Sequence, residues 1–402
     1  MKGNGIKRIK VVIIALIAVV LIAAAVLWSL FGSAVRTLGT IEREGETNLF
    51  TMTYRGDYGF DAFLEQGGAQ TDREVQDYVI RYLLKGLPFT FELPELGCST
   101  ISVQNAAGDG YLFGRNFDLY DSPAMLVKTT PKEGYASLTM VNLAFIGYNE
   151  DHLPTSMTDS ITTLAAPYAP LDGMNEKGLC IGVLLIDTEQ TNQDNGLPDI
   201  TTSTAIRLVL DKAATVEEAL ELLADYDMHS SAGSCYHFQI ADAAGRAVVV
   251  EYIGDQMSVV ESPYATNFLL TPGDYDFGGG QDRFAVLEER YRAAEGRMTA
   301  EQVMDTLQAV SQDRRSEGKD TWTQWSVVYD TKNLTAEVWH MTPYIPTAWR
   351  AENKETAGAR TSVLPLFSFA ASQSSLDIRV CRIAPWMGSV ISTLSKVKPR
   401  WR

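Results

Sequence analysis

The feature that most constrains this chain is an uncharged run at residues 11–32, which consists mainly of Val, Ile, Leu and Ala. About 20 consecutive apolar residues are what a helix needs to cross a bilayer. Four basic residues and no acidic residue precede the run, so the positive-inside rule puts residues 1–10 in the cytoplasm. We therefore predict a single-pass transmembrane helix over residues 11–32, a basic cytoplasmic end and an extracytoplasmic body.

The same region fits a second interpretation, a cleaved secretory signal. Gly32, Ser33 and Ala34 are small residues of the kind that a signal peptidase accepts. The apolar run is longer than the core of a typical signal, which favours the membrane anchor. Under the second interpretation the protein is secreted, and under both interpretations its body lies outside the cytoplasm.

The charge balance argues against a nucleic-acid partner. The 402-residue chain has 34 basic and 50 acidic residues and a formal charge of −16. Such a chain repels the phosphate backbone and anionic membrane surfaces. The four cysteines form no Cys-x-x-Cys pair and no zinc-type spacing with histidine, so we predict neither a metal site nor a cofactor. The residues leave open a disulfide among Cys180, Cys235 and Cys381.

Residues 33–97 separate the apolar run from Cys98, and we expect them to be a linker and pro-segment. Residues 33–55 lack strong periodicity and are typical of a linker leaving a membrane. Residues 72–85 place apolar side chains at helical spacing, which predicts a helix. We expect that helix to form a separate small unit ahead of the main domain.

The main domain, residues 98–345, contains groups of strands followed by groups of helices. A turn at 105–110 joins the first two strands in a hairpin pattern. Further strands are predicted at 137–145, 179–186, 236–242, 247–252, 257–260, 266–270, 325–329 and 336–340, and helices at 204–213, 215–226, 282–294 and 299–311. This grouping predicts an α+β fold in which helices cover antiparallel sheets. Residues 346–402 form a tail for which we predict no structure.

Cys98 is the candidate nucleophile. It follows Gly97 and opens a run in which polar and apolar residues alternate, as on a strand. A cysteine at the start of a mature chain needs no histidine, because its own α-amine, with a pKa of about 7.7–8, can act as the base. Arg115 would favour the thiolate, and Asp118 could hold the α-amine. On these residues alone a purely structural alternative stays open, in which Cys98 is a small buried hydrophobic residue and Arg115 and Asp118 form a surface ion pair.

Five motifs in order resemble a known family. They are Gly-Cys-Ser-Thr at 97–100, Phe-Gly-Arg-Asn-Phe-Asp at 113–118, Gly-Met-Asn-Glu-Lys-Gly-Leu at 173–179, Thr-Asn at 266–267 and Asp-Arg-Phe at 282–284. The set resembles the choloylglycine hydrolase group and the related acyl-CoA:6-aminopenicillanic acid acyltransferase group. Both consist of linear amide C–N hydrolases of the N-terminal-nucleophile superfamily. The resemblance covers residues 98–345.

The resemblance implies an αββα sandwich of two antiparallel sheets, the N-terminal-nucleophile hydrolase fold. It also implies a site in which Cys98 is the nucleophile and Arg115 and Asp118 position and tune it. Asn267 would donate its side-chain amide to the oxyanion of the tetrahedral intermediate. Arg283 matches the family's second active-site arginine and would close the polar network.

Two departures from the family pattern bear on the function. Bile salt hydrolases carry an asparagine at the position that corresponds to Leu185, and a leucine side chain cannot donate a hydrogen bond to an oxyanion. Here 97 residues also precede the cysteine, so activation requires cutting of the Gly97–Cys98 bond, as in the acyltransferase group. The first departure puts bile salt hydrolase activity in doubt, and the second predicts self-cleavage.

Together these observations predict a membrane-tethered cysteine amidase. Its substrate would be a small-molecule acyl amide with a non-peptide linear C–N bond, and its intermediate an acyl thioester on Cys98. One alternative is an acyltransferase that passes the acyl group to an amine instead of water. The other is a non-catalytic ligand sensor on the same fold, since a fold does not guarantee a function.

Overall fold

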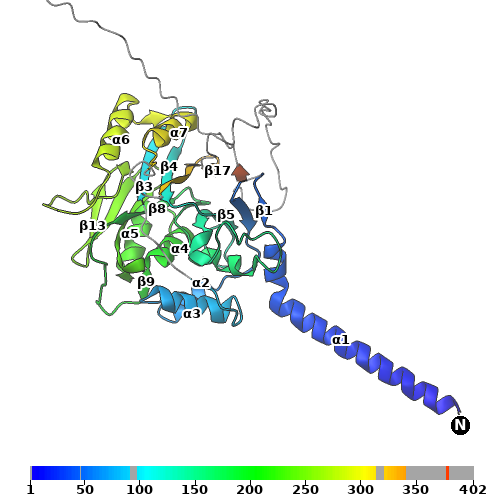
Figure 1. Ribbon diagram of the computed structural model, residues 1–402. Helices are drawn as coiled ribbons and strands as arrows, with labels where there is room; N and C mark the ends of the chain where they lie inside the picture. The colour runs from blue at the N-terminus through cyan, green and yellow to red at the C-terminus, as the bar shows by residue number, and fades with distance from the viewer. Residues whose placement is uncertain (1, 46, 91–96, 314–320, 341–376, 380–402) are drawn as a thin grey trace, which may run out of the picture.

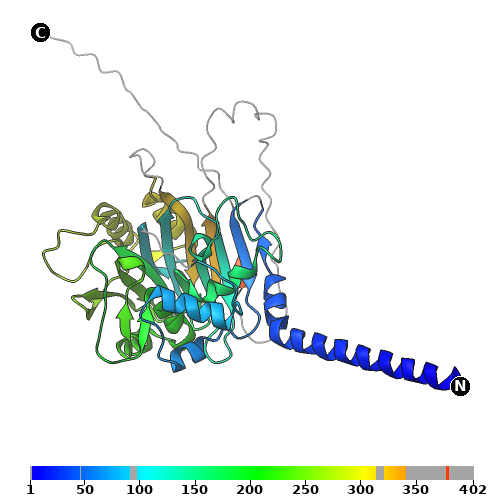
Figure 2. The same ribbon diagram turned by 60° about the horizontal axis from the view of Figure 1, so that its bottom comes forward.

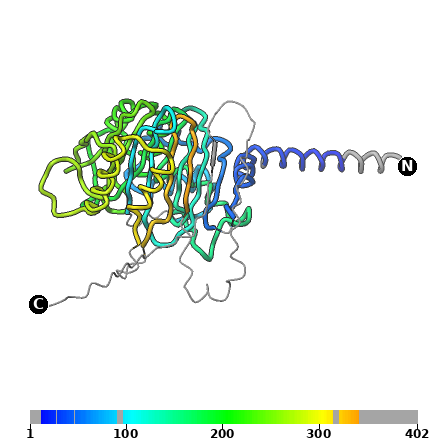
Figure 3. The backbone as a smooth tube through the Cα atoms, turned by 90° about the horizontal axis from the view of Figure 1, so that it is seen from above, coloured from blue at the N-terminus to red at the C-terminus, as the bar shows by residue number. Residues whose placement is uncertain are grey.

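The computed structural model describes residues 2–45, 47–90, 97–313, 321–340 and 377–379. Helix α1 (Lys2–Leu38) extends away from the body of the molecule, as Figure 2 and Figure 3 both show. From Val12 to Val35 it exposes many large apolar side chains. In the part of the chain that the structure describes, no single helix meets the length and hydropathy expected of a membrane span. Two consecutive segments of α1, Val12–Val26 and Trp28–Leu38, are bent by 52° relative to each other and meet the length and hydropathy criteria only when taken together.

The body contains two large sheets. The first has nine strands in the order β1-β2-β5-β6-β7-β8-β11-β12-β13, and most neighbours are antiparallel. These strands are β1 (Glu42–Arg43), β2 (Leu49–Thr53), β5 (Ala124–Thr129), β6 (Ser137–Asn142), β7 (Asp172–Asn175), β8 (Cys180–Ile186), β11 (Cys235–Ala241), β12 (Ala247–Ile253) and β13 (Gln256–Glu261). Five of the nine strands carry apolar side chains on both faces, as a sheet covered on both sides requires.

The second sheet has the order β14-β3-β4-β16-β17-β18, with β15 added beside β3. Its strands are β3 (Gly97–Asn105), β4 (Tyr111–Leu119), β14 (Tyr264–Ala265), β15 (Arg297–Met298), β16 (Trp322–Asp330), β17 (Thr335–His340) and β18 (Asp377–Arg379). The hairpin of β3 and β4 turns at residues 105–110, as the sequence predicts. A small parallel pair, β9 (Asp199–Thr201) and β10 (Asp227–His229), lies apart.

Helices cover the outer faces of both sheets (Figure 1). Helices α4 (Thr202–Lys212) and α5 (Val216–Ala224) lie on the side of the first sheet, and α6 (Gln281–Ala293) and α7 (Ala300–Ala309) on the side of the second. Strands β3 and β8 contact each other, so the two sheets face one another between the helices. The predicted α+β fold with largely antiparallel sheets is confirmed.

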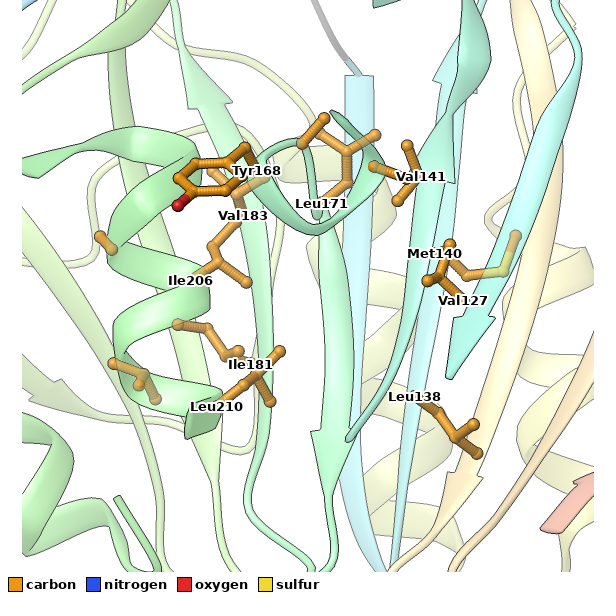
Figure 4. Packing of buried hydrophobic residues seen from close by; sticks show 14 of the residues in the cluster. Val127, Leu138, Met140, Val141, Tyr168, Leu171, Ile181, Val183, Ile206 and Leu210 are labelled. Carbon is orange, nitrogen blue, oxygen red and sulfur yellow. The ribbon is translucent and has the colours of Figure 1, made fainter. Parts of the chain in front are cut away.

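The largest apolar core follows the first sheet. Figure 4 shows Ile206 and Leu210 of α4 beside Ile181 and Val183 of β8. All four side chains are at most 1% exposed. At about 25 cal/mol per Å² of buried apolar area, such contacts are the main force that fixes the layers. A second core joins β3 and β4 to α6 and α7.

The segment expected to be a linker and a separate unit is part of the body. Strand β2 pairs in parallel with β5 in the first sheet, and Leu49, Phe50 and Met52 are buried there. Helices α2 (Phe60–Glu65) and α3 (Asp72–Tyr82) also pack onto the core. The expectation was wrong because β2 alternates over only five residues, with Phe50 and Met52 buried and Thr51 and Thr53 half-buried, and its partner strand β5 lies more than 70 residues away.

One predicted strand is also absent from its place. Residues 266–270 lie outside any strand, and pairing with β3 ends at Ala265. The buried carboxylate of Glu251 instead accepts hydrogen bonds from the backbone of Leu270 and Thr271, at 2.6 and 2.9 Å.

Apart from β18, the tail at 346–402 lies outside the described residues, as does Cys381. The described cysteines Cys98, Cys180 and Cys235 are free thiols.

Candidate active site

Cys98 lies at the start of β3, opposite Phe117 of β4, and is fully buried. Because side chains alternate along a strand, Cys98 faces the first sheet while Ile101 and Val103 pack toward α6 and α7. The alternation seen in the sequence therefore separates the thiol from the helix-facing core. It directs the sulfur into the space between the two sheets.

Arg115 connects the thiol to the opposite sheet. Its Nη2 donates to Sγ of Cys98 at 3.2 Å and to the backbone oxygen of Val183 at 3.0 Å. Its Nη1 forms an ion pair with Asp172 at the start of β7, and both side chains are completely buried. Tyr329 of β16 donates its hydroxyl to the other oxygen of Asp172. Because Arg115 is buried and paired with Asp172, the purely structural alternative of a surface ion pair is excluded for Arg115.

The environment of Cys98 contains opposing electrostatic effects. Burial raises the pKa of the Cys98 thiol, because a thiolate is poorly solvated there. The nearby Arg115 guanidinium lowers this pKa, whereas the Asp118 carboxylate raises it further. The net direction is upward, so the uncut protein holds the sulfur as a thiol.

Asn267 and Arg283 bind the backbone of Cys98. Asn267 Oδ1 accepts the Cys98 backbone N–H at 3.0 Å and also accepts from Arg283 Nη2 at 2.8 Å. Arg283, at the start of α6, donates its Nη1 to the Cys98 carbonyl oxygen at 2.6 Å. Asn267 Nδ2 donates to the backbone oxygen of Leu185 at 2.9 Å. With two donors at one end of the amide and an acceptor at the other, the orientation of this side chain is determined by its partners.

Asp118 of β4 lies opposite Gly97 of β3, next to the peptide bond between Gly97 and Cys98. Its two carboxylate oxygens accept from Gln312 Nε2 and from the Thr323 hydroxyl, each at 2.5 Å. A Cβ on Gly97 would lie 3.1 Å from Asp118 Oδ2 and 2.8 Å from Gln312 Nε2. Arg283 Nη1 is 3.8 Å from Asp118, so the carboxylate also belongs to the network around Cys98.

All five residues predicted for the site therefore come together within one network. Sequence reasoning missed Asp172, although it directly precedes the motif at 173–179, and a carboxylate beside a family motif was the available signal. It also missed Gln312, for which the sequence carries no signal, because its contact with Asp118 spans 194 residues. Leu185 contributes only its backbone oxygen. Among the described residues no group of acids, histidines and cysteines could hold a metal ion.

His237 is a structural residue beside the site. It is fully buried on β11, and its Nε2 donates to the backbone oxygen of Thr266 at 2.7 Å, next to Asn267. Its Nδ1 is 3.3 Å from Glu251. The histidine thus holds the segment that carries Asn267 and does not contact the thiol.

Residues 98–277 match the family model for linear amide C–N hydrolases, choloylglycine hydrolase family. Among solved structures, the chain is similar to a conjugated bile acid hydrolase from Clostridium perfringens (19% identity, TM-score 0.44), covering 60% of this chain and 89% of that one. It is also similar to penicillin V acylase from Agrobacterium tumefaciens (17% identity, TM-score 0.41), covering 61% and 86% respectively. No curated protein matches the chain. Over residues 98–277 the family match confirms the resemblance to the choloylglycine hydrolase group and the expected hydrolase of linear amide C–N bonds.

Proposed function

Since residues 98–277 match the family model for linear amide C–N hydrolases of the choloylglycine hydrolase family, we propose that this protein is a membrane-tethered cysteine amidase that activates itself by cutting the Gly97–Cys98 bond. Its substrate is a small-molecule acyl amide with a non-peptide C–N bond. The observation that supports this most directly is the donation from Arg115 Nη2 to Cys98 Sγ at 3.2 Å in a buried site.

Hydrolysis takes two steps. Sγ of Cys98 bonds to the amide carbon while the thiol proton passes to the α-amine of Cys98 and then to the departing nitrogen, whose C–N bond breaks. Water then attacks the thioester carbon, which releases the carboxylic acid and restores the thiol. Asn267 Nδ2 has a second N–H beyond the one bound to Leu185, and this hydrogen serves the oxyanion.

Self-cleavage uses the same sulfur. Sγ attacks the Gly97 carbonyl carbon, the C–N bond to Cys98 breaks, and the thiol proton ends on the nitrogen that becomes the α-amine. Water then hydrolyses the thioester and leaves a carboxylate on Gly97. The closeness of Asp118 and Gln312 to Gly97 supports this step, because it provides polar groups at the bond that breaks.

Membrane attachment is proposed through α1. The exposed apolar side chains between Val12 and Val35 support it, as does the joint length and composition of Val12–Val26 and Trp28–Leu38. The basic residues ahead of this stretch would keep the N-terminus in the cytoplasm and the catalytic body outside.

Intact mass measurement of the purified full chain tests the proposal. We expect two fragments, the larger beginning at Cys98, and release of acid from a series of chromogenic N-acyl anilides. Cys98→Ala should abolish both cutting and hydrolysis, whereas Cys235→Ala, a change at another buried free cysteine, should leave both unaffected.

The same preparations separate the alternatives. An acyltransferase would form a new amide when a competing amine is added. A ligand sensor would remain uncut as the wild-type protein, and both the wild type and Cys98→Ala would bind acyl amides. An uncut wild-type chain that hydrolyses the anilides would overturn the self-cleavage step.

A further inference from the structure

One buried guanidinium serves two acidic groups in this site. Arg115 donates through Nη2 to Cys98 Sγ and through Nη1 to Asp172, and all three side chains have no exposed surface. The thiol and the carboxylate thus compete for a single positive charge. How that charge is divided decides whether the sulfur carries its proton.

Asp172 is the stronger acid of the two and ionises beside the guanidinium before the thiol does, although burial raises the pKa of its carboxyl group. Its second oxygen accepts the Tyr329 hydroxyl, and the Cys180 thiol of β8 is a further ionisable group close enough to interact with it. Within the described ranges, Arg115 is the only cation that contacts Asp172. A carboxylate buried without a cationic partner is strongly destabilised, so the ion pair must persist for Asp172 to stay charged.

The positive and negative charges around Cys98 are otherwise equal in number. Arg283 faces Asp118 at 3.8 Å, as Arg115 faces Asp172, so two cations are matched by two carboxylates. A thiolate on Cys98 would add an uncompensated negative charge at a fully buried atom. The neutral thiol is the form that this arrangement accommodates.

We propose that Asp172 is a positioning residue that holds the Arg115 guanidinium against Cys98 and, by neutralising it, keeps the sulfur protonated until the attack begins. This inference rests on the proposed role of Cys98 as nucleophile. The Sγ–carbon bond then forms while the thiol proton moves to the α-amine, and that proton is in place for the departing nitrogen. A preformed thiolate would leave the α-amine with no proton to receive from sulfur.

The pH dependence of Cys98 alkylation by iodoacetamide tests this inference on the full-length protein. Peptide mass mapping follows Cys98 separately from Cys180 and Cys235. In Asp172→Asn the guanidinium loses its carboxylate, so the midpoint of the pH–rate curve for Cys98 should fall by about one pH unit or more. At pH values below both midpoints this is about a tenfold faster alkylation. Hydrolysis should fall at the same time, because Arg115 is no longer held.

Two further variants separate charge from structure. Tyr329→Phe removes a hydrogen bond to the same carboxylate but keeps the ion pair, so its midpoint should not fall. Asp172→Glu keeps the charge but displaces it, so its midpoint should stay at the wild-type value while hydrolysis falls about tenfold. This second variant carries the test if Asp172→Asn does not fold.

An Asp172→Asn midpoint equal to or above that of the wild type would overturn the proposal, as would full hydrolysis by Asp172→Glu. Each midpoint is compared within one variant across pH, so a difference in access to the buried thiol does not shift it. Alkylation needs neither cutting nor a substrate. The test therefore stands even if the chain proves not to be an amidase.

Discussion

At the scale of single residues, Gly97 is matched to the side chains around it. A Cβ there would lie 2.8 Å from Gln312 Nε2 and 3.1 Å from both Cβ and Oδ2 of Asp118. We expect Gly97→Ala to displace this pair and slow self-cutting about tenfold, which corresponds to about 1.4 kcal/mol in the barrier. Intact mass over time measures the rate. Gly108→Ala, a change into open space in the turn after β3, should cut at the wild-type rate.

His340 gives a residue-scale prediction for pH. Burial lowers the pKa of His340 from 6.5 to about 4. Since the unfolded chain takes up this proton near pH 6.5 and the folded protein only near pH 4, its contribution to stability is complete above pH 6.5 and is lost as the pH falls toward 4. The difference in free energy of unfolding between His340→Phe and the wild type should therefore shift by about 2 kcal/mol in favour of the variant when the pH is lowered from 8 to 5.

Urea unfolding of the two proteins in detergent at both pH values measures this difference. The exposed Leu197 provides the control, because its side chain does not titrate and Leu197→Ala should therefore change the free energy of unfolding equally at pH 5 and pH 8. An equal effect of His340→Phe at both values would contradict the prediction.

The residues of the site could be predicted from the sequence where they belong to a recognisable motif. Cys98, Arg115, Asp118, Asn267 and Arg283 all meet in the structure as the motifs indicated. Asp172 and Gln312 could not be assigned, because an ion pair between sheets and a contact between distant segments leave no local pattern. The environment of Asn267 was likewise invisible, since its partner Leu185 contributes a backbone atom.

At the scale of elements, the segment carrying Asn267 depends on a neighbouring strand. Burial would raise the pKa of Glu251 on β12, but hydrogen bonds from His237, Thr271 and Leu270 hold it below its usual value. Glu251→Gln keeps the shape but weakens these charge-assisted bonds, so we expect cutting and hydrolysis to fall about tenfold while circular dichroism stays unchanged.

The neighbouring strand β13 offers a matched control for this change. Glu261→Gln alters an exposed carboxylate paired with Arg246 and should have no effect on either activity. If Glu251→Gln hydrolyses the anilides as fast as Glu261→Gln does, the segment does not need this carboxylate.

Elements with local signals were the predictable ones. The helices predicted at 204–213, 282–294 and 299–311 correspond to α4, α6 and α7, and a capping box of Thr299 and Gln302 marks the start of α7. Strand β2 was missed because it pairs in parallel with a strand more than 70 residues away, and no turn links the two. The strand predicted at 266–270 was wrong because Glu251 takes the place of a partner strand for that backbone.

At the scale of the whole molecule, the segment ahead of Cys98 is joined to the body by many contacts besides the peptide bond. Tyr58 donates to Asp211 at 2.7 Å, and Asp72 accepts from the Ser231 hydroxyl at 2.6 Å. The fully buried Phe63 packs edge-on against Tyr168. Together with the pairing of β2 and β5, these contacts make residues 33–45 and 47–90 part of the fold, and the proposed break after Gly97 would leave these contacts intact.

We therefore expect the cut catalytic fragment to remain on the membrane through the fragment that carries α1. Its contacts are mainly apolar and strand-paired, so high salt should not release it from isolated membranes, because salt screens exposed charges and not buried contacts. Phe63→Ala, which removes a buried side chain worth about 3–5 kcal/mol, should release catalytic fragment into the supernatant after cutting. Leu87→Ala, at a residue 48% exposed in the same segment, should release none. Release of the wild-type fragment by salt alone would show that the two pieces are held by surface charge instead of by a shared core.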